Sequence, residues 1–256
     1  MRQLIVIPAR LSSWRFPNKP LTDLLSMPMF EHVYKRSELV SNIDDIVLAV
    51  CDEELYEIAT SKGMKALMTS NEHKTACERV AEASQIMGYT SHNDIVINVQ
   101  ADEPVVPPPV IEMTRDLLLS KSSNNCANLV EQITDAKDLN NKHRVKAILS
   151  VNNNLIFLSR ESIPSTFFDI DNMTIFYRLT CITAYRGPFL QNYCTLSRTP
   201  IELIEGNDMM RVIEHDIQIP SGISPYRTHP VDTPEDVKEV ITILKNDDWY
   251  NKYKSL

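Results

Sequence analysis

Short, nearly continuous apolar runs alternate in the first half of the chain with segments whose apolar positions recur every three or four residues. The runs are typical of strands covered on both faces, and the longer spacing is typical of helices packed on a sheet. The predicted strands are 4–7, 45–50, 94–99 and 126–130, and the predicted helices are 53–62, 75–87 and 110–119. This alternation predicts an α/β fold with a mostly parallel sheet flanked by helices.

The pattern changes after residue 142, where strand-like runs lie closer together. These are 145–151, 155–158 and 175–185. The asparagines 152–154 predict a hairpin turn, because Asn tolerates a positive φ without glycine. We therefore expect an α/β domain of residues 1–141 and 217–256, with a β-rich subdomain of residues 142–216 inserted into it.

Two Thr-Pro pairs mark predicted helix starts. Thr199-Pro200 predicts a helix that runs towards Glu214, and Thr233-Pro234 predicts a last helix near the end of the sequence. Threonine is a good N-cap and proline fits the first helical turn, whose N–H groups have no partner within the helix.

Composition narrows the class of protein. The 256 residues are 43% apolar and 23% charged, which excludes a mainly disordered or fibrous chain. The net charge of −8 argues against broad binding to nucleic acid or to an anionic membrane, although a local basic pocket remains possible. Only 5 residues are glycine, so turns must depend on proline, asparagine and aspartate.

The cysteines and apolar segments indicate the compartment. The 5 cysteines are scattered and odd in number, which favours buried reduced thiols over a metal site or a disulfide framework. No apolar run has the length of a membrane span, and Pro8 and Arg10 interrupt the first one before a signal-peptide core could form. We expect a cytoplasmic protein.

A cationic loop follows the first predicted strand. The loop begins after Pro8 and contains three cations, Arg10, Arg15 and Lys19. Two further prolines stiffen it. Open α/β sheets bind ligands beyond the carboxyl ends of their strands, and a stiff cationic loop there suits a polyphosphate. A solvated basic loop is the alternative interpretation. The loop is not a Walker loop, because it has no glycine.

Acidic residues follow another predicted strand. Gln100-Ala101-Asp102-Glu103-Pro104 comes directly after the strand at 94–99. Acids beside a phosphate would repel it unless a cation lies between them, so Mg²⁺ is implied if the loop above binds phosphate. Asp232 is a candidate second ligand. A helix-starting turn at Asp102 and a capping role for Asp232 are the alternatives.

Thr75 and Glu78 predict a capping box at the start of the helix 75–87. His73 is interpreted as a hydrogen-bonded loop residue, since no second metal ligand lies at a suitable spacing. The sequence lacks a Gly-x-Ser-x-Gly elbow, a Gly-x-Gly-x-x-Gly fingerprint and a His-Glu-x-x-His pair. Serine hydrolases, dinucleotide oxidoreductases and zinc proteases are therefore disfavoured.

A set of short motifs occurs in a characteristic order. They are Ile7-Pro8-Ala9-Arg10, Arg15-Phe16-Pro17-Asn18-Lys19-Pro20-Leu21, Met68-Thr69, Asn98-Val99-Gln100-Ala101-Asp102-Glu103-Pro104, Phe157-Leu158-Ser159-Arg160-Glu161-Ser162-Ile163-Pro164 and Val231-Asp232-Thr233-Pro234-Glu235-Asp236. With this set the chain resembles the 3-deoxy-manno-octulosonate (Kdo) cytidylyltransferase family over essentially its whole length. The resemblance implies a glycosyltransferase-A-like fold, a homodimer and transfer of CMP from CTP to the anomeric hydroxyl of a 2-keto-3-deoxy sugar acid.

The resemblance also implies roles for individual residues. The catalytic residues would be Arg10, Lys19, Asp102 and Asp232, with Asp102 and Asp232 as the Mg²⁺ ligands. The nucleotide-binding residues would be Pro8, Arg10, Arg15, Lys19, Thr75, Arg79 and Gln100. The sugar-acid-binding residues would be Arg160, Tyr185, Asp208 and Met209, with Arg160 on the carboxylate. The β-rich subdomain of residues 142–216 would bind the sugar and form the dimer.

The chain departs from the family pattern at several positions. Asn18 replaces a glycine, which is tolerable if its φ is positive, and Ala101 and Ala76 replace two others. Leu179 and Met209 stand where the family has His and Gln, so donors for a polyol are lost. We expect the acceptor to be Kdo or a modified Kdo-like acid. A non-catalytic CTP-binding homologue and a nucleotidyltransferase for a sugar phosphate remain the alternatives.

Overall fold

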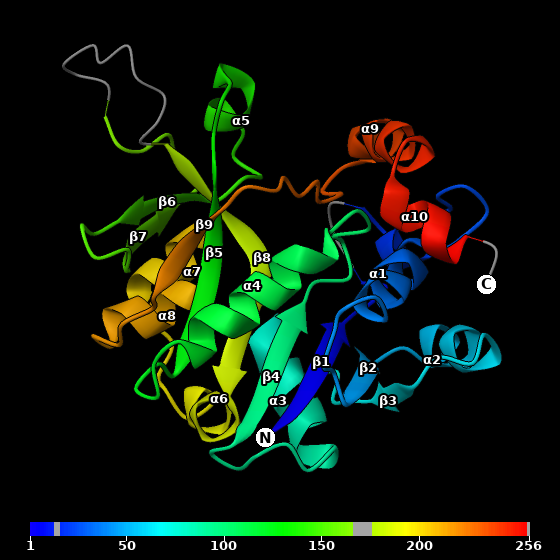
Figure 1. Cartoon of the computed structure of the whole chain (residues 1–256), viewed down its shortest axis with the longest axis horizontal. Coiled ribbons are helices and arrows are strands. Elements are labelled where there is room, and N and C mark those ends of the chain that lie inside the picture. Colours follow the sequence, from blue (N-terminus) through cyan, green and yellow to red (C-terminus); the bar gives the residue numbers. More distant parts are fainter. Residues whose placement is uncertain (13–15, 166–175, 255–256) are drawn as a thin grey trace.

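The computed structural model describes residues 1–12, 16–165 and 176–254. Within these residues nine strands form one sheet, whose main path has the order β3-β2-β1-β4-β8-β5-β9 (Figure 1). The strands are β1 (Arg2–Pro8), β2 (Asp45–Val50), β3 (Ala66–Met68), β4 (Asp94–Val99), β5 (Cys126–Gln132), β6 (Lys146–Leu149), β7 (Leu155–Ser159), β8 (Tyr177–Arg186) and β9 (Ser221–Ser224).

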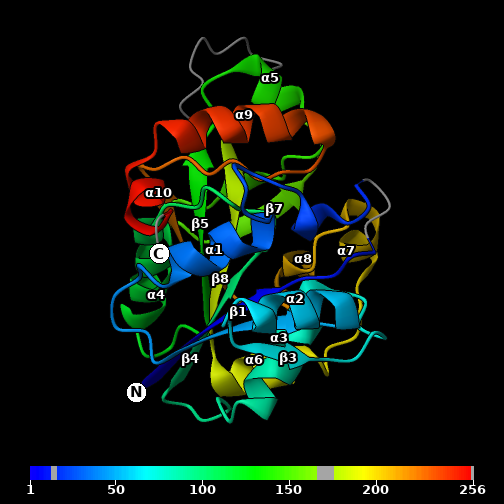
Figure 2. The same cartoon turned by 90° about the vertical axis from the view of Figure 1, so that its right-hand side faces the viewer.

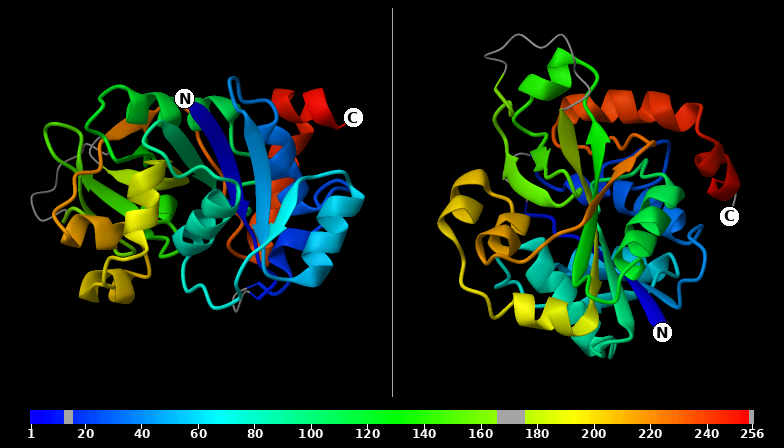
Figure 3. Two further views of the ribbon diagram at one scale, coloured as in Figure 1. Left: turned by 90° about the horizontal axis from the view of Figure 1, so that it is seen from below. Right: turned by 60° about the vertical axis from the view of Figure 1, so that its left-hand side comes forward.

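Helices cover both faces of this sheet (Figure 3). They are α1 (Met29–Ser37), α2 (Glu53–Ser61), α3 (Ala76–Ile86), α4 (Pro108–Leu119), α5 (Ala136–Asn140), α6 (Gly187–Tyr193), α7 (Pro200–Glu205), α8 (Met209–Glu214), α9 (Pro234–Lys245) and α10 (Asp248–Tyr253), with a 3-10 turn η1 (Lys19–Leu21). No helix in the described ranges is long and apolar enough to cross a membrane.

The predicted α/β fold is confirmed. Strands β3, β2, β1 and β4 are all parallel, and β1 lies between β2 and β4. β8 runs antiparallel between β4 and β5, while the hairpin of β6 and β7 branches from β8. The sheet is therefore mostly parallel on one side and mixed on the other.

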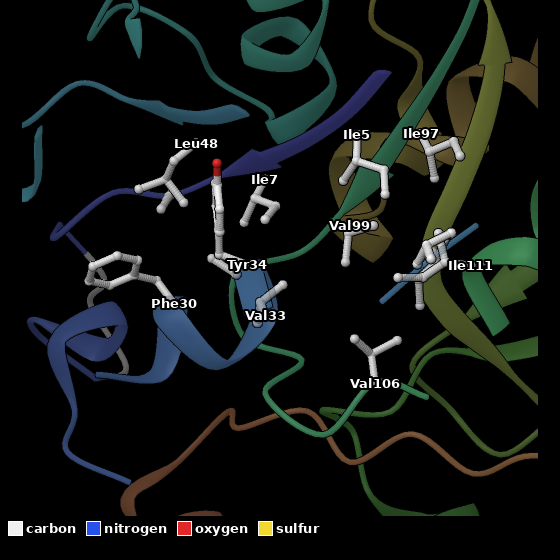
Figure 4. Close-up of a cluster of buried hydrophobic side chains, with 14 of the residues drawn as sticks. Ile5, Ile7, Phe30, Val33, Tyr34, Leu48, Ile97, Val99, Val106 and Ile111 are labelled. Carbon is white, nitrogen blue, oxygen red and sulfur yellow. The ribbon is translucent and has the colours of Figure 1, made fainter. Parts of the chain in front are cut away.

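Alternation along β1 divides the core between the two faces of the sheet. Ile5 and Ile7 point to the face covered by α1, α2 and α4, where they pack with Phe30 and Ile111 (Figure 4). Leu4 belongs to the cluster on the opposite face, which includes residues of α3, α6 and α8. Because both faces are covered, β1 reads as a continuous apolar run.

Two helix predictions need correction. The helix predicted from residue 110 begins at Pro108, because proline is compatible with a first turn whose N–H groups have no helical partner. The single helix predicted from Thr199 to Glu214 is wrong: α7 ends at Glu205 and α8 starts at Met209. Gly206 adopts φ +59° between them, and this left-handed conformation ends α7. Helices α1 and α6 and strands β3 and β9 were not predicted.

The predicted division into two domains stays a prediction. In the segment 142–216, β6 and β7 extend away from the parallel strands, but β8 pairs with both β4 and β5. The segment is thus part of the same sheet as the residues on either side of it. Asn153 in the β6–β7 turn has φ +56°, as the asparagine triplet predicted.

The C-terminal helices pack on α1 (Figure 2). Buried His32 of α1 lies 2.9 Å from the Tyr253 hydroxyl through Nδ1 and 2.8 Å from the Leu24 carbonyl through Nε2. The carbonyl requires a proton on Nε2, so Nδ1 accepts from Tyr253. Burial lowers the pKa of His32 to about 4, which keeps the ring neutral at neutral pH.

This histidine predicts acid destabilisation. Between about pH 6.5 and 4 the unfolded chain binds a proton that folded His32 does not, so the free energy of unfolding falls as the pH falls. The slope approaches about 1.4 kcal/mol per pH unit. The free energy of unfolding is measured with urea at pH 7 and at pH 5. Its decrease between the two pH values should be smaller for His32→Gln than for the wild type. The control is His215→Gln at an exposed histidine, and its free energy of unfolding should decrease as much as that of the wild type. An equal decrease in all three proteins would contradict the assignment.

Candidate active site

Two neighbouring cavities open at the carboxyl ends of β1 and β4. The first, which we call the nucleotide cavity, has a volume of about 260 Å³. It is lined by nearly all the residues proposed for nucleotide binding, namely Pro8, Arg10, Lys19, Thr75, Arg79 and Gln100, and also by Asp102. Arg15, the remaining one, lies outside the described residues.

The pairing of β1 with β4 brings the two loops together. In this parallel pair Val6 is opposite Asn98, so Pro8 and Gln100 leave the sheet side by side. Arg10 then follows β1, and Asp102 follows β4. Chain segments almost a hundred residues apart thus place a cation and a carboxylate at one edge of the sheet, as expected for ligand sites in open α/β sheets.

Lys19 joins three segments at this edge. Its Nζ donates to Asp102 Oδ2 at 2.5 Å and to the Val231 carbonyl at 2.9 Å. The Val231 N–H in turn donates to the Asp102 carbonyl at 2.9 Å. Since Asp232 is the next residue, these bonds hold both predicted metal ligands near the same ammonium group.

Asn18 places Lys19 for these contacts. It precedes η1 with φ +56° and ψ +23°, so the condition under which an asparagine can take the place of a glycine here is met. Asparagine adopts this conformation at a lower energetic cost than most residues with a side chain. The loop can therefore keep this backbone conformation with asparagine in the place of glycine.

The amino end of α3 forms the opposite wall of the nucleotide cavity. Thr75 and Glu78 make the predicted capping box. Arg79 is buried and donates to the Thr69 hydroxyl and to the Ser70 carbonyl. His73 is hydrogen-bonded to Glu82 at 2.6 Å, which confirms its interpretation as a hydrogen-bonded loop residue.

The second cavity, which we call the acceptor cavity, has a volume of about 240 Å³. It is lined by all the residues proposed for sugar-acid binding, namely Arg160, Tyr185, Asp208 and Met209, and by Asp232. Gln100 and Asp102 line both cavities. The two cavities therefore meet at these two residues.

Arg160 is fixed in place by carbonyl oxygens. Its guanidinium donates to the carbonyls of Glu205 at 2.8 Å, Lys142 at 3.1 Å and Gly206 at 3.3 Å. These partners are neutral, so the positive charge of the side chain is not cancelled by them. The arrangement suits a group that binds an anion from the cavity.

Two further arginines line the acceptor cavity and were not singled out from the sequence. Arg178 is buried against Glu131, with two guanidinium nitrogens bound to one carboxylate oxygen at 3.1 and 2.8 Å. Arg144 lies 3.2 Å from Asp232 Oδ2. Both have carboxylate partners, whereas no ion pair of Arg160 occurs among the described residues. Neither arginine has a local sequence motif, because each partner is at least 47 residues away.

Two sulfur atoms contact the hydroxyl group of Tyr185, a residue that lines the acceptor cavity. The Tyr185 hydroxyl lies 2.9 Å from Cys77 Sγ and 3.3 Å from Met209 Sδ. Burial raises the pKa of Tyr185 well above its usual value, so the phenol stays protonated. Burial also raises the pKa of Asp208. Leu179 and Met209 themselves offer no hydrogen-bond donor to the cavity.

Only one of the two adjacent acids after β4 faces the cavities. Glu103 is fully buried, and neither carboxylate oxygen is hydrogen-bonded to any residue that the structure describes. Burial, with a smaller contribution from Asp102, raises the pKa of Glu103 to about 8. Glu103 is therefore mostly neutral at pH 7, and Asp102 carries the negative charge at this position.

The remaining acids suit a magnesium ion that shares its coordination with a substrate. Asp102 and Asp232 both line the acceptor cavity and offer hard oxygen donors. The described residues contain no group of three or more His, Cys, Asp or Glu side chains placed to hold a metal by themselves. Mg²⁺ commonly takes one or two carboxylates and completes its shell with phosphate oxygens and water. The donor set therefore fits this ion.

The fold and the site define a nucleotidyltransferase-type α/β protein, and comparison with known proteins gives the family. Residues 4–219 match the family model described as cytidylyltransferase, and this chain belongs to that family. The resemblance found in the sequence is thereby confirmed.

Several relatives and solved structures are similar over nearly the whole chain. The 3-deoxy-manno-octulosonate cytidylyltransferase of Francisella tularensis subsp. holarctica (strain LVS) is 38% identical over 241 residues, covering 92% of this chain and 96% of that protein. The enzyme of the same description from Coxiella burnetii (strain Dugway 5J108-111) is 33% identical over 243 residues, covering 92% and 97%. A structure of CMP:2-keto-3-deoxy-manno-octonic acid synthetase complexed with CTP has a TM-score of 0.86 at 29% identity, covering 96% and 99%.

Proposed function

We propose that this protein transfers CMP from CTP to the anomeric hydroxyl of a 2-keto-3-deoxy sugar acid and releases pyrophosphate. The observation that carries this proposal is the meeting of two cavities at Gln100 and Asp102. One cavity has the cations that a triphosphate requires, and the other has an arginine suited to a carboxylate. The relatives named above, which cover this chain almost end to end, support the same activity.

The nucleotide cavity would bind CTP through charge and backbone geometry. Arg10 and Lys19 would contact the triphosphate, and the amino end of α3 at Thr75 would favour a negative or hydrogen-bond-accepting group. Gln100 would contact the ribose, and Arg79 would shape the wall near the base. Because the loops are held by hydrogen bonds, much of this arrangement exists before the nucleotide binds.

Asp102 and Asp232 would hold Mg²⁺ together with phosphate oxygens. When bound, the ion would neutralise charge on the phosphates and thereby favour attack at the α-phosphorus. Lys19 contacts Asp102, and Arg144 contacts Asp232, so each of these carboxylates already has a cationic neighbour.

The acceptor cavity would orient the sugar acid. The fork of Arg160 would bind the carboxylate of the acid with two parallel hydrogen bonds. This would direct the anomeric oxygen towards Asp102 and the α-phosphorus. The new bond would join that oxygen to the α-phosphorus, the bond from the α-phosphorus to the bridging oxygen would break so that pyrophosphate leaves, and the acceptor's hydroxyl proton would pass to solvent. Positioning and charge stabilisation suffice, without a covalent enzyme intermediate.

Leu179 and Met209, which stand where the family has His and Gln, both line the acceptor cavity, and the Tyr185 hydroxyl is shared with two sulfur atoms. Losing a donor weakens the preference for the substrate hydroxyl that it would bind. Gln100 and the three arginines of the same lining can still bind polar groups of a sugar acid. We therefore propose Kdo or a modified Kdo-like acid as the acceptor.

The direct test is pyrophosphate release. Purified protein with CTP and Mg²⁺ should release pyrophosphate in the presence of one of Kdo, 8-amino-Kdo, Kdn or N-acetylneuraminate. Asp232→Asn should reduce kcat by at least about 100-fold, since the ion loses a ligand while the fold is retained. Asp248→Asn, a change at the start of α10, should retain the activity. Binding of CTP without turnover of any of the four acids would instead favour a non-catalytic CTP-binding homologue.

A variant of Arg160 tests the acceptor assignment. Arg160→Ala should raise the KM for the sugar acid by roughly 10- to 100-fold, as expected for the loss of a charge-assisted hydrogen bond. The KM for CTP should change much less. Arg198→Ala removes a partly exposed arginine outside both cavities and should leave both constants unchanged. An equal rise in the two KM values would contradict a specific role on the acceptor.

We also propose that the protein is a homodimer that uses the segment 142–216. Among its described residues, 142–165 and 176–216, this segment exposes four large apolar side chains, Val151, Ile156, Leu203 and Ile204, with exposed fractions of 99, 50, 56 and 83%. Exposed apolar groups of this kind are common at subunit contacts.

Light scattering after size exclusion tests the dimer. The measured mass should be about twice the 29.3 kDa of the chain. Ile204→Asp should weaken association, because it would bury a charge. Ile86→Asp, on exposed α3 surface outside the segment, should not. A wild-type protein that is monomeric at micromolar concentration would rule out the dimer.

A further inference from the structure

Arg144 lines the acceptor cavity and contacts the segment that carries Asp232. Its Nη1 donates to the Pro230 carbonyl and to Asp232 Oδ2, both at 3.2 Å. Its Nη2 lies 3.8 Å from Asp236 Oδ1. The residue is only 8% exposed. A guanidinium from just before β6 is therefore in direct contact with a carboxylate that we assign to the metal.

The backbone of Arg144 is held by a buried lysine. Lys146 Nζ donates to the carbonyls of Arg144 at 2.8 Å, Arg160 at 2.5 Å and Asn141 at 2.9 Å. Burial lowers the pKa of Lys146. The three carbonyl oxygens accept hydrogen bonds from its side-chain nitrogen. Lys146 thus holds the backbone at Arg144 and at Arg160 together.

One donor of Arg144 has no partner. Its Nε is buried and makes no hydrogen bond among the described residues. An unpaired buried donor is costly, and an acceptor atom of a ligand in the same cavity would remove that cost. Arg144 therefore has an anionic partner, Asp232, and one donor, Nε, that is not bonded to any described residue.

We propose that Arg144 and the metal ion compete for Asp232, and that this competition couples metal–nucleotide binding to acceptor binding. A carboxylate oxygen that coordinates a divalent cation interacts less with a guanidinium, and the two cations repel each other. The guanidinium would then turn to the sugar acid in the cavity that it lines. This inference rests on the proposed function and adds a residue that sets metal affinity and binding order.

Calorimetric titration of CTP tests the competition without catalysis. The dissociation constant of CTP is measured in EDTA and in Mg²⁺, with no acceptor present, and the ratio of the two gives the metal-linked gain. Arg144→Gln should increase this ratio by roughly 10-fold, because a competing positive charge is removed. Arg144→Lys, which keeps the charge, should stay within about 2-fold of the wild type. Thermal unfolding of each variant serves as the control for folding.

Titration of the acceptor tests the coupling. In the wild type, Kdo should bind more tightly in the presence of Mg²⁺ and CDP, an unreactive nucleotide, than in their absence, because linkage is reciprocal. Arg144→Gln should lose most of this gain. The wild-type titration remains informative even if Arg144→Gln does not fold.

The possible failures are distinguishable. A metal-linked gain that is unchanged or reduced in Arg144→Gln would overturn the competition and leave Arg144 as a positioning group for Asp232. Wild-type acceptor binding that is independent of Mg²⁺ and CDP would overturn the coupling. Neither result affects the proposed reaction, whose failure would appear as a wild-type protein that releases no pyrophosphate from CTP with any of the four acids.

Discussion

The ammonium group of Lys19 is the contact on which the site depends. It binds the Asp102 carboxylate and the Val231 carbonyl, and so connects the loop after β1, the loop after β4 and the segment before α9. The three segments are far apart in sequence, and the sheet alone aligns only the first two. The positive charge of Lys19 offsets the negative charge of Asp102, and its bond to the Val231 carbonyl holds the residue before Asp232 at the same ammonium group.

Charge is distributed differently in the two cavities. The nucleotide cavity contains Arg10 and Lys19 beside the amino end of a helix, which suits a highly charged ligand. The acceptor cavity contains three arginines, but Glu131 and Asp232 neutralise two of them. Arg160 lines the cavity without an ion pair among the described residues. This difference explains how a triphosphate and a singly charged acid could be directed to different sides of Asp102.

Much of the fold could be predicted from local patterns, because β2 and β4 have the predicted bounds and β1 differs by only a few residues. At Asn18 only the condition of a positive φ could be stated from the sequence, and the structure meets it. The capping box at Thr75 was also predictable, since it depends on short-range contacts. The position of β8 between β4 and β5 was not, because strand pairing is set by distant parts of the chain. For the same reason no motif pointed to Arg144, whose partner Asp232 lies 88 residues away.

The place of β8 has a consequence for the order of assembly. In the folded sheet β1, β2, β3 and β4 pair with neighbours that all lie within the first 99 residues, apart from the contact of β4 with β8, whereas β5 pairs only with β8 and β9. As the chain leaves the ribosome, β5 must therefore wait more than forty residues for its first neighbour. Long-range pairings of this kind form slowly, because a large loop must close before the contact forms. The half of the sheet that bears the acceptor cavity would thus mature after the half that bears the triphosphate loop.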